Sequence, residues 1–176
     1  MRYLAAALAL FLAPACVSAQ QHVDRLIPNW FYETLTDSMG RGDIKTATTV
    51  STNELRFSSP YEGAQRAYVN LRVHPKNGKS VILVIEKGQF LCHNRAPTLF
   101  SRSDVFHCDV MVRFDDGRVR NFEAVGPSDY DSTMLFIQDQ GGFTKELLKA
   151  RHLRIEAQFY REGFKVMMFD VAGLKW

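Results

Sequence analysis

Three pairs of strand-like segments, each pair joined by a short turn that contains glycine, dominate the pattern of this sequence. In residues 67–74 apolar side chains alternate with polar ones, which is typical of a strand that buries one face. Asn77-Gly78 then predicts a type I′ turn, because both central residues of that turn need positive φ. The run 81–85 that follows is apolar throughout and predicts a central strand covered on both faces.

Two further hairpins are predicted in the second half of the chain. They occupy residues 106–124, with a turn at Asp116-Gly117, and residues 153–171, with a turn at Glu162-Gly163. Additional strands are predicted near residues 30–35, 45–52 and 132–138, and one short helix within residues 141–152, with Thr144 as its cap. We therefore predict a mainly β protein, an antiparallel β-sandwich or a strongly curled sheet with one short helix in its C-terminal half.

The N-terminal segment predicts export. Arg2 is followed by an apolar stretch and then by small residues up to Ala19, which is the pattern of a secretory signal peptide. We expect a signal peptide over residues 1–19, cleaved after Ala19, and a single β-sandwich domain over residues 20–176 that is periplasmic or secreted. An alternative is a lipoprotein signal, in which Cys16 is lipidated and anchors the chain to a membrane. No later apolar segment reaches the roughly 20 residues that span a bilayer, so we expect no transmembrane helix in the mature chain.

The charge of the chain is nearly balanced. Its formal net charge is +3 at pH 7, with 22 Lys and Arg residues against 19 Asp and Glu residues. Nucleic-acid-binding domains concentrate basic residues in a much stronger patch or stripe. We therefore exclude nucleic acid as the partner, and the sequence predicts no cofactor. Gly78-Lys79-Ser80 does not form a nucleotide-binding loop, because the earlier glycine of that motif is absent and a strand follows.

Cys92-His93 and His107-Cys108 raise the question of a metal site or a disulfide. Neighbouring side chains on extended backbone point to opposite faces, so the four residues converge poorly on a metal, and the usual spacing of zinc ligands is missing. An exported protein meets an oxidising environment, in which two cysteines most often pair. We predict a disulfide between Cys92 and Cys108, with a metal site and a free catalytic thiol as weaker alternatives.

Two groups of residues are predicted to contact a partner protein. The predicted disulfide holds the loop that follows Cys92 at the surface, so its first residues are candidates for binding. The hairpin at Asp116-Gly117 is expected to place three arginines on one face, as a positive patch for an acidic surface. The candidates are His93, Asn94, Arg95, Arg113, Arg118 and Arg120. A solvated charged face that protects the edge of the sheet is the alternative for the arginines. For the loop, the alternative is that the disulfide only stabilises a long connection.

The second half of the chain resembles a known family. The residues that carry the resemblance are VRFDDG at 112–117, LFI at 135–137, the stretch 143–163 that begins FTKELLKARH, and FDVAGL at 169–174. With these residues the chain resembles the type VI secretion-associated VasI-like family of small exported bacterial proteins. The resemblance implies a secreted sandwich with a strand, a helix and a terminal hairpin. It supplies no catalytic residue, and the N-terminal half of the chain departs from the family.

These observations favour a binding protein over an enzyme. We expect a non-enzymatic exported accessory protein that acts through contacts with another protein of the cell envelope. An inhibitor, an immunity factor and a component of a secretion or envelope machine all fit this description. The alternatives are a small exported hydrolase and a carrier of a small apolar ligand inside the sandwich. A hydrolase needs a concave pocket with two or more coupled titratable groups, whereas a binder presents exposed aromatic residues. The candidates for exposure are Trp30, Phe31, Tyr61 and Tyr130, with packing in the core as the alternative for Trp30.

Overall fold

The computed structural model describes residues 28–92 and 106–176 of the chain. The predicted signal peptide, the alternative lipidation site Cys16 and the candidate contact residues His93, Asn94 and Arg95 lie outside the described residues. Both described ranges contribute strands to the same sheet and side chains to the same core.

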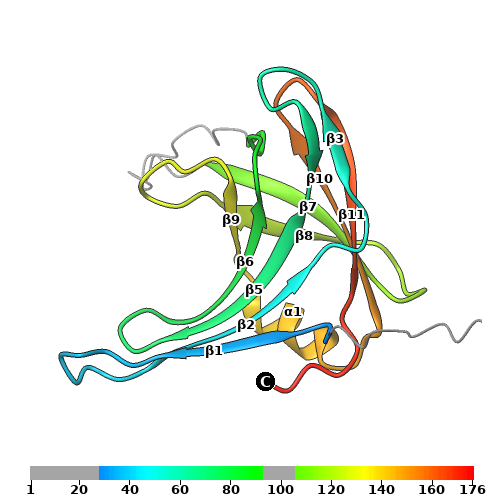
Figure 1. Cartoon of the computed structure of the whole chain (residues 1–176). Helices are drawn as coiled ribbons and strands as arrows, with labels where there is room; N and C mark the ends of the chain where they lie inside the picture. The colour runs from blue at the N-terminus through cyan, green and yellow to red at the C-terminus, as the bar shows by residue number, and fades with distance from the viewer. Residues whose placement is uncertain (1–27, 93–105) are drawn as a thin grey trace, which may run out of the picture.

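The described residues form nine antiparallel strands in one sheet and two strands in a second, small sheet. The large sheet consists of β1 (Phe31–Leu35), β2 (Ile44–Val50), β5 (Ala67–His74), β6 (Gly78–Ile85), β7 (His107–Phe114), β8 (Arg120–Val125), β9 (Met134–Ile137), β10 (His152–Phe159) and β11 (Gly163–Asp170). Their order across the sheet is β1-β2-β5-β6-β9-β8-β7-β10-β11. The small sheet pairs β3 (Leu55–Phe57) with β4 (Gly63–Gln65). The predicted mainly β, antiparallel fold is confirmed, in the form of one continuous and strongly curled sheet (Figure 1).

The three predicted hairpins, β5–β6, β7–β8 and β10–β11, are confirmed. The predicted type I′ turn at Asn77-Gly78 is wrong, because only Gly78 of the two has positive φ, at 73°. His74 pairs with Gly78, so the loop holds three residues and glycine follows it in the left-handed region, as is common for loops of this length. The Nδ1 atom of His74 accepts hydrogen bonds from the backbone N–H groups of Lys76 and Asn77 and fixes the loop.

Curling brings the edge strand β11 next to the residues that follow β2. Just after β2, the backbone N–H of Thr52 donates to the carbonyl of Met168 in the edge strand β11 at 2.7 Å. The carboxamide of Asn53 continues this contact, since its Nδ2 donates to the Val166 carbonyl at 2.9 Å and its Oδ1 accepts from the Met168 N–H at 2.8 Å. An edge strand carries unpaired backbone groups, and here one side chain satisfies part of that edge in place of another strand.

Phenylalanine rings fill the interior of the curled sheet at the end where β10 ends. Phe159 packs against Phe57 of β3 and against Phe90, with ring centroids 5.1 and 4.7 Å apart. Gly88 passes directly over this cluster: its φ is +124°, and a Cβ atom there would lie 2.6 Å from the Phe57 ring. A residue without a side chain is therefore required for the segment before Phe90 to cross this end of the sheet.

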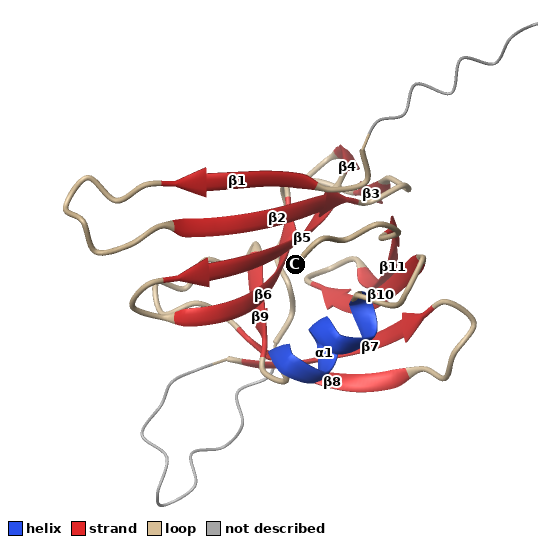
Figure 2. Ribbon diagram, turned by 90° about the horizontal axis from the view of Figure 1, so that it is seen from below, coloured by secondary structure: helices blue, strands red, loops and turns tan. Residues whose placement is uncertain are grey.

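A second phenylalanine cluster fills the opposite end, where α1 (Gln140–Leu147) lies over the opening of the curled sheet (Figure 2). Phe143 of the helix packs against Phe114 of β7 and Phe122 of β8, with ring centroids 5.2 and 5.5 Å apart. Phe143 and Leu147 are completely buried. The space between the two clusters is occupied by the alternating apolar residues of the strands, which the period-two pattern directs inward.

The helix begins earlier than its sequence suggested. Its N-cap is Asp139, whose Oδ1 accepts from the backbone N–H of Gly142 at 2.9 Å. The prediction of Thr144 as the cap is therefore wrong: a carboxylate is available five residues earlier and satisfies an N–H group of the first turn. No helix in the part of the chain that the structure describes is long and apolar enough to span a membrane.

Candidate functional site

Cys92 and Cys108 form a disulfide, with their Cα atoms 4.5 Å apart, as predicted. Cys108 is buried on the inner face of β7, the face that carries the core, and Cys92 packs against that core. The neighbouring His107 lies on the outer face, where its Nδ1 contacts a carboxylate oxygen of Glu123 in β8. The opposite directions of His107 and Cys108 match the expected alternation, and they separate the histidine from the sulfur atoms.

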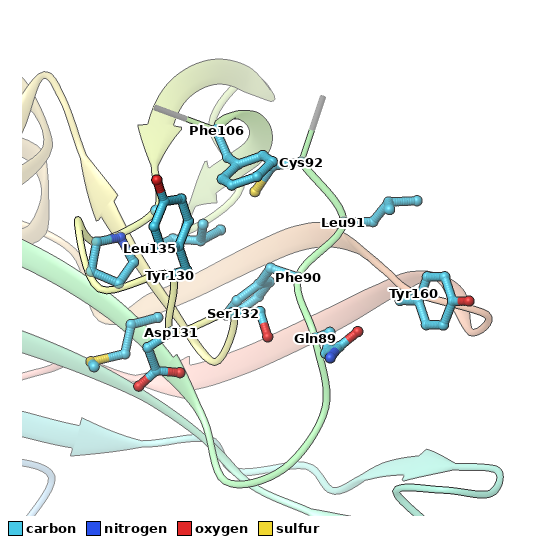
Figure 3. A pocket seen from close by; sticks show the side chains of 13 residues that line it. Gln89, Phe90, Leu91, Cys92, Phe106, Tyr130, Asp131, Ser132, Leu135 and Tyr160 are labelled. Atoms are coloured by element: carbon cyan, nitrogen blue, oxygen red, sulfur yellow. The ribbon is translucent and has the colours of Figure 1, made fainter. Parts of the chain in front are cut away.

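Next to the disulfide, the surface has an aromatic pocket of about 360 Å³. Phe90 and Leu135 form its buried floor, and Phe106 and Tyr130 form its mouth. Figure 3 shows the rings of Phe106 and Tyr130 standing beside Phe90, with Tyr160 at the outer rim. The two mouth rings meet edge to face with centroids 6.0 Å apart, although Phe106 is 37% and Tyr130 64% exposed. Aromatic residues are enriched at the buried centres of protein–protein interfaces compared with the rest of a protein surface.

Backbone hydrogen bonds hold the floor of the aromatic pocket in place. The N–H of Phe90 donates to the carbonyl of Ser132 at 2.8 Å, and the N–H of Leu91 donates to the carbonyl of Gln158 at 2.8 Å. The N–H of Tyr160 returns a bond to the carbonyl of Gln89 at 2.9 Å. The segment 89–92, which ends at the disulfide, is thus hydrogen-bonded on both sides, to a residue just before β9 and to the end of β10. The pocket is therefore largely pre-formed.

The polar groups of the aromatic pocket are few and are used structurally. Asp131 is the one carboxylate among its described lining residues, and its Oδ1 accepts from both the backbone N–H and the hydroxyl of Thr133, at 2.9 and 2.6 Å. This is a turn-stabilising arrangement rather than an acid-base pair. Within residues 28–92 and 106–176 no group of three or more His, Cys, Asp and Glu side chains could hold a metal ion. The pocket can therefore enclose an apolar or aromatic group, with carbonyls and Ser132 at its edge.

The side chains with shifted pKa values lie outside the aromatic pocket, and each shift has a local cause. The pKa is lowered for Asp37, Glu86, Asp115 and Glu162 and raised for Tyr68. In every case the largest cause is a hydrogen bond that fixes a turn or a strand end, such as the bond between the hydroxyl of Tyr68 and the carboxylate of Glu86. None of these five groups lines the aromatic pocket. Shifted pKa values cluster at many catalytic sites, and here they coincide with structural turns instead.

The expectation that Arg113, Arg118 and Arg120 share one face is wrong. Val112 pairs with Arg120 across the β7–β8 hairpin, so Arg120 lies on the inner face and Arg113 on the outer face. Arg118 is exposed in the loop before β8. The register thus separates the three guanidinium groups, and they do not form one positive patch.

Arg120 has a structural environment. Its guanidinium carbon lies 5.8 and 5.3 Å from the ring centroids of Phe114 and Phe122, and its Nη2 is 3.9 Å from Oε1 of Glu146 in α1. A cation over aromatic faces is attracted by their quadrupoles. Arg120 therefore covers the second phenylalanine cluster and links it to the helix.

Arg113 is also engaged within its own hairpin. Its Nε donates to the carbonyl of Gly117 at 3.0 Å, and its Nη2 is 3.4 Å from Oδ1 of Asp116. Beside it, the carboxylate of Asp115 accepts from the backbone N–H of His152 at 2.8 Å and also from that of Arg151, which lowers the pKa of Asp115. These bonds tie the β7–β8 turn to the start of β10.

Of the aromatic residues proposed as exposed contacts, Tyr130 is the one in the pocket. Phe31 is exposed on the edge strand β1, and Tyr61 packs against the core. Trp30 is buried, and its indole N–H donates to the Val171 carbonyl at 2.9 Å. Sequence reasoning missed Phe106 and Tyr160, because each stands at the end of a strand pattern and only the fold brings them beside Tyr130.

Comparison of the chain with protein-family models, with curated proteins and with solved structures finds no match. The resemblance to the VasI-like family therefore stays a prediction that rests on the quoted residues alone.

Proposed function

We propose that this chain is an exported, non-enzymatic binding protein that receives an apolar or aromatic side chain of a protein partner in the aromatic pocket. The observation that carries the proposal is the exposed Phe106–Tyr130 pair above a rigid apolar floor. Partners bind most strongly through a few aromatic residues in well-packed, desolvated pockets. Export to the periplasm or the medium is part of the proposal, supported by the N-terminal pattern and by the disulfide.

A binding role fits the pocket better than the two alternatives do. A hydrolase requires a nucleophile or a coupled acid and base, and the described lining residues offer Asp131 in a turn and a few hydroxyl groups. A carrier requires an interior cavity, and the inner face of the sheet is packed with side chains from one phenylalanine cluster to the other. The aromatic pocket, by contrast, opens at the surface, where a partner can reach it.

The test is capture of the partner from a native envelope extract by the immobilised, oxidised mature chain. The variant F106S/Y130S removes the mouth of the pocket, and the control F31S/F164S removes two rings on β1 and β11 that are at least as exposed as the pocket pair. We expect the pocket variant to retain at most about one tenth of the partner, since a binding hot spot contributes about 2 kcal/mol or more. The control should capture as much as the unmodified chain. Equal capture by both variants would show that the pocket is not the binding site.

A further inference from the structure

A second surface hollow lies at the opposite end of the sheet, between its inner face and α1. The register places Thr34 of β1, Lys45 of β2, Val73 of β5 and Lys79 of β6 in one row across the strands. Two adjoining hollows of about 430 and 410 Å³ share Lys79 and the helix residues Thr144 and Leu148 in their walls. We call this continuous feature the lysine groove, and Figure 2 shows how α1 faces the inner side of the sheet there.

Positive charge is concentrated in the lysine groove. Its described lining includes five lysines, all exposed, and one acidic side chain: Lys45, Lys79, Lys145, Lys149, Lys175 and Glu33. None of the five ammonium groups forms an ion pair with another described residue. The nearest helix carboxylate, Glu146, is directed to Arg120. A chain with a formal net charge of only +3 therefore gathers much of its uncompensated charge in one hollow.

The lysine groove is suited to an extended chain better than to a single phosphate. It contains no arginine among its described lining residues, so the planar, bidentate donor that favours phosphate is missing. The N-terminus of α1, which could also attract a phosphate, is already capped by the carboxylate of Asp139. A flat membrane surface cannot enter a hollow between a helix and the inner face of a sheet.

The dimensions and the apolar residues of the groove match a polypeptide. Lys45 and Lys79 are separated by two strand spacings, or about 10 Å. An extended chain places successive side chains of one face about 7 Å apart, and the long lysine side chains can reach several such carboxylates together. Tyr32, Leu148 and Trp176 lie in the same groove and offer contacts to aliphatic stems. The Tyr32 hydroxyl accepts from the backbone N–H of Lys175 at 2.8 Å, which holds the C-terminal wall of the groove against β1.

We infer that the lysine groove binds an acidic, extended polypeptide segment. This inference rests on the proposed function, because it names the chemistry of a second contact made by a protein partner. It adds a site that the aromatic pocket does not include, since no residue lines both.

The experiment measures binding of a labelled peptide of alternating Glu and Ser to the oxidised mature chain by fluorescence anisotropy, with the Gln–Ser peptide as the neutral comparison. The groove variant is K45Q/K79Q. The matched control is K76Q/K87Q, which removes the same charge from two exposed lysines outside the groove. We expect the groove variant to bind the peptide about tenfold more weakly than the unmodified chain, because each exposed ion pair changes the affinity by up to about fivefold. The control variant should bind less than about twofold more weakly. Affinity should also fall as salt is raised.

Several results would overturn the inference. Equal losses in the two variants would mean that net charge, and not the groove, attracts the peptide. Equal binding of the neutral peptide would remove the role of the lysines. Binding of inorganic polyphosphate or of anionic phospholipid vesicles without binding of the Glu–Ser peptide would assign the groove to another class of ligand. The pocket variant F106S/Y130S should bind the peptide normally, so failure of the pocket and failure of the groove are measured separately.

Discussion

The contact between Asn53, which follows β2, and the edge strand β11 gives the sharpest stability prediction. Asn53 bonds the edge strand β11 twice, as a donor to the Val166 carbonyl at 2.9 Å and as an acceptor from the Met168 N–H at 2.8 Å. The substitution N53A removes both bonds. The substitution N53D keeps an acceptor for the Met168 N–H and loses the donor, so it separates the two contributions.

The expected cost follows from the number and the exposure of these bonds. A typical hydrogen bond contributes a net 0.5–1.5 kcal/mol, so two bonds contribute about 1–3 kcal/mol. Both bonds of Asn53 are open to water, which can partly replace the lost partner. We therefore expect N53A to lower the free energy of unfolding by about 1–2 kcal/mol. A domain of this size loses about 2–4 °C of melting temperature per kcal/mol, which gives a decrease of about 2–8 °C.

Thermal unfolding and amide hydrogen exchange together check this reasoning. The exchange of the Met168 N–H should become faster in N53A, because its acceptor is gone, and should change less in N53D. The control N121A removes a single exposed bond, from Asn121 to Asp109 on the outer face, and should cost less than about 0.5 kcal/mol. Unchanged exchange at Met168 in N53A would refute the claim that this side chain completes the edge of the sheet, whatever the change in melting temperature.

Three further predictions concern the disulfide, the second phenylalanine cluster and stability in acid. Replacing Cys92 and Cys108 by alanine, or reducing them, should lower stability by about 3 kcal/mol in denaturant titrations, because the bridge spans 16 positions; a loss below about 1 kcal/mol would contradict this. R120E should lower the free energy of unfolding by about 1–2 kcal/mol, because Arg120 lies over two phenylalanine rings. R118E should have almost no effect, and equal melting temperatures of the two variants would argue against the cation–π contact. Because folding lowers the pKa of Asp115, its ionised carboxylate stabilises the folded state. This stabilisation is fully present above the ordinary Asp pKa, near 3.9, and is lost as the pH falls through the lower pKa of the folded state. D115N keeps an acceptor and should show a flatter loss of stability below about pH 4; an unchanged acid profile would dismiss this role.

The strands could be predicted from the sequence because their period of two is a local property. Side chains that alternate along residues 67–74 or 153–160 can bury one face only as strands, and the structure has β5 and β10 there. The short strands β3 and β4 carry too few residues for a pattern. They form because Phe57 packs on Phe159, a contact across about a hundred positions that no local signal reports.

The arginine patch shows how a small error in register changes a predicted site. A two-residue turn at Asp116-Gly117 would pair Arg113 with Arg120 and place both on one face. The observed pairing of Val112 with Arg120 differs by one residue, and a shift of one residue turns every side chain of one strand to the other face. The disulfide was predictable for a different reason: the N-terminal pattern predicts export, and two cysteines of an exported chain most often pair. The aromatic pocket could not be predicted from the sequence, because its floor and its mouth come from three separate segments of the chain.

The two proposed contact surfaces lie at opposite ends of β6, which sets a geometric condition on the partner. Lys79 stands near the start of that strand, and the segment with Gln89 and Phe90 follows its end. At about 3.3 Å per residue the strand alone separates the surfaces by about 20 Å. A partner that uses both must therefore present an apolar group and an acidic segment at least this far apart. The disulfide constrains only the pocket end, so reduction should weaken capture at the aromatic pocket while the lysine groove keeps its affinity for the acidic peptide.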